Sequence, residues 1–473
     1  MSWRAYARLK SAMKKCLTLR MIVVAAVVVL CSHSPVPAQT PPQGNAGSVS
    51  TITPGPATSA SPTPTTAGPV PATGAEGKVL YGLQGVLVET LDGTTVAIQS
   101  PDETFNPASA IKLATAYVAL KTFGPRHRFT TGVWTTGTFD KSTGTISGDL
   151  YISGRDPSLH YEHAVMIAQQ LNNLGIRTVT GNLIVAPGFT LNFSWSARRS
   201  AEQFYDTLDS TLRTAEATRA WEYERTALGD KASLATVPSV AVMGDVEVNA
   251  VAPGARLILS HKSSKLVDVL KVLLCYSNNF MAERLGDSIG GIEAVRRELT
   301  NSLGMSSSDL RISSLSGLGV NRVTPRTMMK IFRALREELR EHRLSTTDIM
   351  PVAGIDPGTL QERFTGLPWR GSVVAKTGTL VRTDRGVSSL VGQLKTASGE
   401  TLLFVIMNQR GSVLRFRENQ DYFLMQIQNT RGGPKAFEYK PQMLAMKLAN
   451  TENSIASGSD EFEPAPKPNT SSP

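Results

Sequence analysis

Cysteine is scarce in this chain of 473 residues, which contains only three. Cys16 and Cys31 lie in a leader segment that we expect to be removed, so Cys275 remains alone. A single cysteine cannot form an intramolecular disulfide, although an oxidising compartment outside the cytoplasm would permit one. The sequence therefore excludes a fold built on a disulfide framework.

The N-terminal region lacks an apolar run long enough to cross a membrane. The run at 21–31 is far shorter than the roughly 20 residues of a spanning helix, and residues 1–20 carry basic side chains and no acidic one. With small residues at Val36 and Ala38, this pattern predicts a secretory signal (1–38) cleaved after Ala38. An uncleaved anchor is the alternative, and Leu30 disfavours a lipid anchor at Cys31.

A concentrated basic patch is also missing. The formal net charge is +10, and six of these charges lie in residues 1–38, so the mature chain carries about +4. Nucleic-acid binding would need a basic stripe or patch, so we expect no nucleic-acid partner. We predict an exported protein of the periplasm or cell envelope, which touches a membrane only if its signal stays uncleaved.

The two ends of the mature chain have little material for a core. Residues 39–77 are rich in proline, threonine and serine, and the tail 449–473 is similar. Such segments cannot bury enough apolar surface to fold, so we predict a disordered linker and a disordered tail. No repeat at a fixed period is visible in the folded part between them.

The folded part combines strand and helix patterns. Two β-prone runs flank Asp92-Gly93, which predicts a hairpin over 86–99. A helix is expected after Pro107, and Thr324-Pro325 has the residue types of an N-cap and first helical position. Residues 371–376, 387–395 and 401–408 predict three successive strands, and residues 197–230 are charged and helix-prone. This order indicates a layered α/β or α+β fold.

Ser109 and Lys112 form the first candidate site, in the segment NPASAIK. Positions three apart share one helical face, so the amine can reach the hydroxyl. Lysine has a pKa of about 10.4 and is a base at neutral pH only if burial and a second cation lower that value. Ser11 and Lys14 repeat the spacing inside the leader, which shows that the pair alone is weak evidence.

Two further motifs supply partners. Ser277-Asn278-Asn279 follows an apolar helix, and Lys376-Thr377-Gly378-Thr379 follows a predicted strand. Taken singly, the first could be an ordinary helix N-cap and the second a strand end with a turn glycine. Together and in this order, S-x-x-K, S-x-N and K-T-G are the motif set of penicillin-binding proteins and serine β-lactamases. Lys376 also provides the second cation that Lys112 requires.

The sequence around these motifs resembles the D-alanyl-D-alanine carboxypeptidase/endopeptidases, the class C low-molecular-mass penicillin-binding proteins. The resemblance covers about 80–190 and 258–410, and four other segments share it, namely 148–159, 314–327, 350–360 and 371–380. Three departures stand out. Asn278 replaces the usual aspartate, Arg155 replaces a usual glycine, and the stretch between the first two motifs is short, with 195–255 dissimilar.

The resemblance implies a transpeptidase-like serine DD-peptidase fold, in which helices flank a central antiparallel sheet and a smaller domain is inserted. We therefore predict a discontinuous catalytic domain over 78–146 and 258–448, and an inserted domain, reduced in size, over 147–257. The implied partners are peptidoglycan stem peptides ending in D-Ala-D-Ala, and β-lactams as acylating inhibitors.

The resemblance also implies the role of each site residue. Ser109 would be the acylated nucleophile, and Lys112 would take its proton. Ser277 and Lys376 would pass a proton to the departing D-alanine, and Asn279 would bind the acyl side of the substrate. The substrate-binding strand residues would be Thr377, Gly378 and Thr379, with backbone N–H groups of Ser109 and Thr379 as the oxyanion hole. The group that activates the deacylating water is left open.

Other sites are less well supported. His160-Tyr161-Glu162-His163 lacks a third metal ligand with clear spacing, so we predict a polar surface turn and neither metal nor cofactor. The chain has no G-x-S-x-G, which counts against an α/β-hydrolase. We predict a D-Ala-D-Ala carboxypeptidase, endopeptidase or both. The alternatives are a β-lactamase or esterase on the same fold, or a catalytically idle protein that binds wall peptides.

Overall fold

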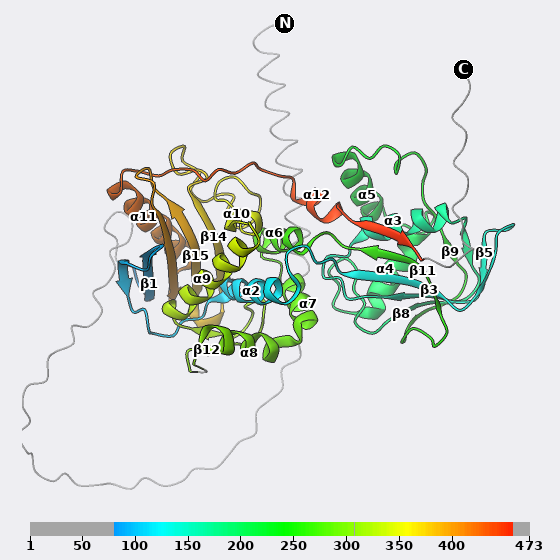
Figure 1. Cartoon of the computed structure of the whole chain (residues 1–473), viewed down its shortest axis with the longest axis horizontal. Helices are drawn as coiled ribbons and strands as arrows, with labels where there is room; N and C mark the ends of the chain where they lie inside the picture. Colours follow the sequence, from blue (N-terminus) through cyan, green and yellow to red (C-terminus); the bar gives the residue numbers. More distant parts are fainter. Residues whose placement is uncertain (1–79, 307, 457–473) are drawn as a thin grey trace, which may run out of the picture. The chain divides into compact units, whose positions relative to one another are not determined.

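The computed structural model describes residues 80–306 and 308–456, which form two large β-sheets with helices packed on them (Figure 1). The predicted signal (1–38) and linker (39–77) lie outside the described residues. None of the helices in the described part of the chain is long and apolar enough to span a membrane.

The first sheet is five-stranded and antiparallel, in the order β14-β15-β16-β1-β2. The predicted hairpin is confirmed, since β1 and β2 pair across a turn in which Gly93 has a φ of +96°. The three successive strands near the end of the fold are confirmed as well. The strands are β1 (Leu83–Thr90), β2 (Thr95–Gln99), β14 (Val373–Leu380), β15 (Val387–Lys395) and β16 (Thr401–Gln409).

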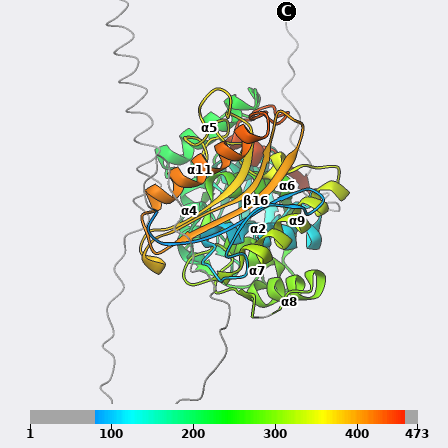
Figure 2. The same ribbon diagram turned by 90° about the vertical axis from the view of Figure 1, so that its left-hand side faces the viewer.

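Alternating side chains of this sheet enter two different cores. Leu87 and Val405 join the core that contains helix α9 (Pro325–Glu341), whereas Val88 and Phe404 join the one that contains α11 (Val413–Thr430). Successive residues of a strand point to opposite faces, so each face is covered by its own helix (Figure 2). Helix α9 begins as predicted, because the Thr324 side chain accepts a hydrogen bond from the backbone N–H of Thr327 and Pro325 occupies the first turn.

A central buried helix connects the first sheet to a helical layer. A 3₁₀ turn, η2 (Ala108–Ile111), leads into α2 (Lys112–Phe123), whose residues are buried from Lys112 to Leu120. The surrounding elements of this layer are α6 (Leu266–Tyr276), α7 (Asn279–Ile289), α8 (Gly291–Leu303), α10 (Thr346–Ile349), β12 (Leu310–Arg311), β13 (Arg322–Val323) and the short turn η3 (Thr383–Arg385).

The second large sheet has six strands in the order β10-β8-β6-β3-β11-β17, with its own core of buried residues. Its strands are β3 (Thr130–Thr135), β6 (Leu150–Ser153), β8 (Leu183–Val185), β10 (Val246–Val248), β11 (Arg256–Lys262) and β17 (Glu452–Ile455). A smaller sheet and four helices complete this part of the fold, which we call the second sheet's unit. They are β4 (Thr138–Asp140), β5 (Thr145–Ser147), β7 (Thr178–Val179), β9 (Ala241–Val242), α3 (Tyr161–Asn173), α4 (Ala197–Leu208), α5 (Ala215–Ala227) and α12 (Leu444–Ala449).

The second sheet crosses the predicted domain boundaries. Strand β3 was expected in the catalytic domain, which we predicted to continue to residue 146, but β3 pairs with β6 and β11 of the second sheet. Five of the seven residues of β11 also fall outside the predicted insertion of 147–257. The prediction that the tail is disordered from 449 is wrong for residues 452–455, because they pair with β11 as strand β17. The segment 457–473 lies outside the described residues.

Candidate active site

Ser109 and Lys112 lie where the 3₁₀ turn passes into the buried helix. Ser109 is in η2 and Lys112 is the first residue of α2. The Lys112 ammonium nitrogen lies 3.0 Å from the Ser109 hydroxyl oxygen. Ala108 has a φ of +46°, a left-handed conformation that is rare for a residue with a Cβ. Such strain is common at functional sites, and here it directly precedes the serine.

Lys112 is completely buried, and its amine has three polar neighbours. Besides Ser109, it donates to the Asn279 side-chain oxygen at 2.7 Å and to the Ser316 carbonyl. Burial, together with the positive charge of Lys376, lowers the pKa of Lys112 well below its usual range, and Glu283 opposes this shift. The requirement for a second cation near Lys112, inferred from the sequence, is therefore met by the predicted residue.

Ser277, Asn278 and Asn279 form the junction between α6 and α7. Ser277 ends α6 in a left-handed conformation, with a φ of 56°, and Asn278 caps α7 by accepting a hydrogen bond from the Met281 N–H. The simple N-cap interpretation is thus correct for Asn278. The two outer side chains face the lysines instead, since Ser277 accepts from Lys376 at 2.8 Å and Asn279 accepts from Lys112.

Lys376 lies in β14 and is also fully buried. Its amine donates to Ser277 and to the Thr377 carbonyl, both at 2.8 Å, and burial lowers its pKa to about 7. Thr379, three residues after Lys376 on the same strand, accepts a hydrogen bond from Arg417 of α11 at 2.8 Å. Arg417 therefore adds a fixed positive charge beside Thr379.

Gly378 allows β14 to lie against the turn that carries Ser109. A Cβ at this position would lie 2.4 Å from the Pro107 carbonyl oxygen and 3.2 Å from the Ala110 nitrogen. Only a residue without a side chain permits this separation. The structure thus brings all eight predicted site residues into one neighbourhood, through η2, the α6–α7 junction and β14.

The sequence prediction missed a group of polar residues that hold the turn before Ser109. Asn106 is fully buried, accepts from the Ala108 N–H at 3.0 Å, and donates to Asp384 at 2.8 Å. Asp384 in turn receives two hydrogen bonds from Arg322, at 2.7 and 3.0 Å. Asn106 directly precedes Pro107 in the motif, but its distant partners gave no local signal.

Glu283 was missed for a similar reason. It lies one turn after Asn279 on α7 and accepts hydrogen bonds from the backbone N–H groups of Leu315 and Ser316, at 3.3 and 2.8 Å. These bonds orient the Ser316 carbonyl that receives Lys112. Glu283 is therefore a positioning residue, which acts through the 315–316 backbone.

The segment His160–His163 is not the polar surface turn that we expected. Glu162 and His163 are fully buried, Glu162 pairs with Arg225 at 2.6 Å, and His160 contacts Glu224 at 3.0 Å. Although burial opposes it, the Glu224 carboxylate raises the pKa of His160 to about 9. Burial lowers the pKa of His163 well below its usual value, so this imidazole is neutral.

The geometry around Ser109 is suited to nucleophilic catalysis. A hydroxyl lies beside a buried amine of lowered pKa, and a second amine–hydroxyl pair, Lys376 and Ser277, lies close enough to shift the first electrostatically. An amine that is neutral near pH 7 can accept the serine proton. Cys275 offers no competing nucleophile, because burial raises the pKa of its thiol to about 12.

Comparison with known proteins gives a consistent family match. The model of the D-Ala-D-Ala carboxypeptidase 3 (S13) family matches residues 75–242 and 231–423. A D-alanyl-D-alanine carboxypeptidase of an Actinomadura species is 28% identical over 422 residues, with 68% of this chain and 77% of that protein covered. A carboxypeptidase of Mycobacterium tuberculosis is 27% identical over 423 residues, covering 80% of this chain and 87% of its relative.

Solved structures share the fold. A predatory peptidoglycan endopeptidase of Bdellovibrio bacteriovorus superposes with a TM-score of 0.65 at 22% identity, covering 79% of this chain and 98% of the other. The corresponding values for penicillin-binding protein 4 of Haemophilus influenzae are 0.55 and 21%, with coverages of 74% and 97%. These similarities support the layered fold, with a helix-flanked antiparallel sheet, that the sequence predicted.

Proposed function

The chain belongs to the D-Ala-D-Ala carboxypeptidase 3 (S13) family of serine peptidases, and we propose that it acts on peptidoglycan stem peptides through an acyl-Ser109 intermediate. Its substrates would be stem peptides ending in D-Ala-D-Ala, cleaved as a carboxypeptidase, and cross-linked stems, cleaved as an endopeptidase. The main support is one contact, the 3.0 Å separation between the Ser109 hydroxyl and the buried Lys112 amine.

Acylation would begin with Lys112 in its neutral form. The amine accepts the Ser109 proton while the serine oxygen attacks the carbonyl carbon of the penultimate D-alanine. The Lys112 pKa is lowered by burial and by Lys376, which makes this transfer feasible at neutral pH. Backbone N–H groups of Ser109 and Thr379 would stabilise the oxyanion, and such donors contribute about 3 kcal/mol each in other enzymes.

Collapse of the tetrahedral intermediate breaks the peptide bond. The leaving nitrogen of the terminal D-alanine takes a proton by way of Ser277 and Lys376, which lie 2.8 Å apart. The terminal carboxylate would be bound by Thr377 and Thr379, with Arg417 and Lys376 supplying positive charge. Asn279 would form a hydrogen bond with the amide of the acyl portion. Water then hydrolyses the acyl-enzyme and regenerates Ser109.

The place of action follows from the substrate. Peptidoglycan lies outside the cytoplasmic membrane, so we propose export to the periplasm or cell envelope, directed by the leader at 1–38. Mass spectrometry of the protein recovered from the envelope should give an N-terminus at Gln39 if the leader is cleaved after Ala38. An intact leader would support the anchored alternative.

Covalent labelling by a fluorescent penicillin tests the nucleophile. Wild-type protein should be labelled, Ser109→Ala should not, and Lys112→Met should be labelled very slowly. Ser210→Ala is a matched control, because Ser210 is an exposed serine of the second sheet's unit and should not affect labelling. Labelling of Ser109→Ala at the wild-type rate would refute the assignment.

Peptide assays then separate the candidate activities. Release of D-alanine from a pentapeptide indicates a carboxypeptidase, and cleavage of cross-linked dimers indicates an endopeptidase. Rapid hydrolysis of penicillin without peptide cleavage would favour the β-lactamase alternative. Labelling without turnover of any substrate would favour a protein that only binds wall peptides.

A further inference from the structure

Three buried polar atoms in the second sheet's unit face one another without hydrogen-bond partners. They are one carboxylate oxygen of Asp156 (Oδ2), Nδ1 of His163 and Nε2 of His261, and none has a partner among the described residues. One ligand atom from each of the three residues lies within 4.8 Å of the other two. Burying such atoms unpaired is costly, so three together indicate that something else binds them.

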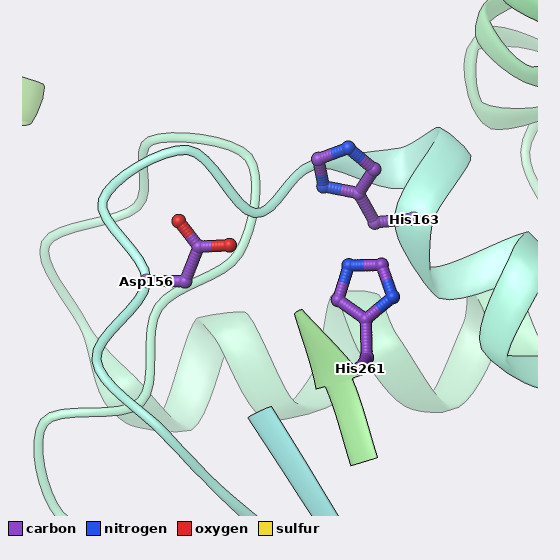
Figure 3. A group of neighbouring side chains, drawn as sticks. All are labelled: Asp156, His163 and His261. Carbon is purple, nitrogen blue, oxygen red and sulfur yellow. The ribbon is translucent and has the colours of Figure 1, made fainter. Parts of the chain in front are cut away.

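The three side chains come from different elements that meet at one point (Figure 3). Asp156 is in the turn after β6, His163 is in the first turn of α3, and His261 is on β11. Their exposed fractions are 3%, 0% and 0%. Figure 3 shows the carboxylate directed toward the two imidazole rings, which lie one above the other.

The second polar atom of each of these three side chains is held by a hydrogen bond within the protein. The Asp156 Oδ1 accepts from the N–H and hydroxyl of Ser158, at 2.8 and 2.6 Å. His163 uses Nε2 to donate to the Leu448 carbonyl at 2.9 Å, and His261 uses Nδ1 to donate to the Asn453 side-chain oxygen at 2.8 Å. Each imidazole therefore directs the lone pair of its other nitrogen toward the centre of the cluster. This arrangement is typical of histidines that bind metals.

His160, which adjoins the cluster, is not a suitable ligand. One of its ring nitrogens contacts the Ser158 carbonyl and the other contacts Glu224, so neither offers a free lone pair. Thr131 is a better fourth ligand. It is paired directly with His261 on the neighbouring strand, so both side chains lie on the same face, and its buried hydroxyl has no partner among the described residues.

We propose that Asp156, His163 and His261 bind a divalent cation of the zinc class, with Thr131 or a water molecule as the fourth ligand. Two imidazoles and a carboxylate are a ligand set that Zn²⁺ accepts, at bond lengths of about 2.0–2.2 Å. A tetrahedral ion would hold the ligand atoms roughly 3.4 Å apart, so each would move inward by less than about 1 Å. Because the site is fully buried, the ion would be structural.

The proposed ion would also fasten the C-terminal segment. Leu448 belongs to α12 and Asn453 to β17, and both accept hydrogen bonds from the metal-binding histidines. Metal binding fixes the orientation of both imidazoles and so strengthens these contacts. Loss of the ion should therefore loosen residues 444–455 before it affects the first sheet.

Metal analysis of the full chain tests the proposal. Protein carrying a tag without histidines and purified without chelator should contain one equivalent of zinc or a similar ion. Chelation should lower the melting temperature and expose the 444–455 segment to protease, and zinc chloride should restore both. For a tightly bound ion, the expected melting shift is roughly 10 °C. Cobalt added to the chelated protein should give the visible absorption bands of a tetrahedral site.

Variants assign the metal to this cluster. Asp156→Asn, His163→Gln and His261→Gln should each lose most of the metal, whereas His342→Gln should keep it, because His342 lies on the surface and pairs with Glu338. Metal retained in both His163→Gln and His261→Gln would overturn the proposal. So would wild-type protein that contains no metal and whose melting temperature zinc does not raise. The second result needs no variant, so it holds even if the variants fail to fold.

Discussion

Replacement of Gly378 by alanine is the sharpest test of how the site is assembled. The added methyl carbon would lie 2.4 Å from the Pro107 carbonyl oxygen and 3.1 Å from the Ala108 Cβ. Ordinary contact needs about 3.4 Å or more, so β14 and the turn that carries Ser109 must separate by about 1 Å. This displacement moves Ser109 away from Lys376 and Thr379 but leaves the Ser109–Lys112 pair, which lies within one segment, unchanged.

A 1 Å misplacement of catalytic groups can reduce a rate by about 100-fold, which corresponds to about 3 kcal/mol of transition-state stabilisation. We therefore expect fluorescent penicillin to acylate Gly378→Ala about 100-fold more slowly than wild type. The second-order rate constant of acylation, measured by stopped-flow mixing, tests this. The protein should remain folded, as judged by its circular dichroism spectrum.

Gly399→Ala is the control for general weakening of the sheet. Gly399 lies in the turn between β15 and β16 with a φ of +93°, so alanine strains the backbone there, but its Cβ would touch nothing within 4 Å. This variant should lose stability and keep the wild-type acylation rate. Equal acylation rates in Gly378→Ala and wild type would refute the reasoning, as would an equal loss of rate in both variants.

Two further predictions concern the partners of the serine. Asn278→Ala should lower the free energy of unfolding by about 1 kcal/mol through loss of the α7 cap and should slow acylation. Asn278→Asp should keep wild-type stability and acylation rate, because aspartate caps equally well and its charge is favourable at a helix N-terminus. Thermal melting and penicillin labelling measure these effects, and a stable, fully active Asn278→Ala would contradict them. The second prediction concerns pH, because burial lowers the Lys376 pKa from 10.5 to about 7. Between these two values the unfolded chain keeps a proton on Lys376 that the folded protein loses. The free energy of unfolding should therefore rise with pH, by up to about 1.4 kcal/mol per pH unit. Urea unfolding between pH 7 and 9 should show this rise in wild type and a smaller one in Lys376→Met. Equal slopes would mean that burial does not lower the Lys376 pKa.

Much of the site could be predicted because its motifs are local. The Ser109–Lys112 spacing, the break after the apolar helix at Ser277, and the glycine after Lys376 are each visible within a few residues. The requirement for a second cation near Lys112 came from its pKa alone, and the structure has Lys376 in that place. Hairpin β1–β2 and the cap of α9 were predictable for the same reason, since turn and capping preferences are local properties.

The features that were missed depend on contacts between distant segments. Asn106 and Asp384 are hydrogen-bonded across 278 positions of the chain, and neither residue has an unusual neighbourhood in the sequence. Strand β3, with the sequence TTGVWT, has no residue that marks it for one sheet, so its sequence could not show which sheet it joins. Strand β17, with the sequence ENSI, is too short and polar to give a strand signal.

The same reasoning applies to the buried cluster in the second sheet's unit. His160 and His163 were visible as a pair, but Asp156 and His261 come from other elements, and burial cannot be read from a polar tetrapeptide. A polar sequence usually indicates surface. Here the fold gathers carboxylates and imidazoles inside the protein, which the tetrapeptide alone could not show.

The second sheet cannot be completed until its end strand, β17, has been synthesised. Its partner β11 ends at Lys262, and β17 begins at Glu452. At synthesis rates of about 5–20 residues per second, the intervening chain takes roughly 10 to 40 s to emerge. During that interval β11 is an open sheet edge that can pair with another chain. We therefore expect β11 to remain open to pairing with another chain until β17, the last strand of the described residues, has joined it.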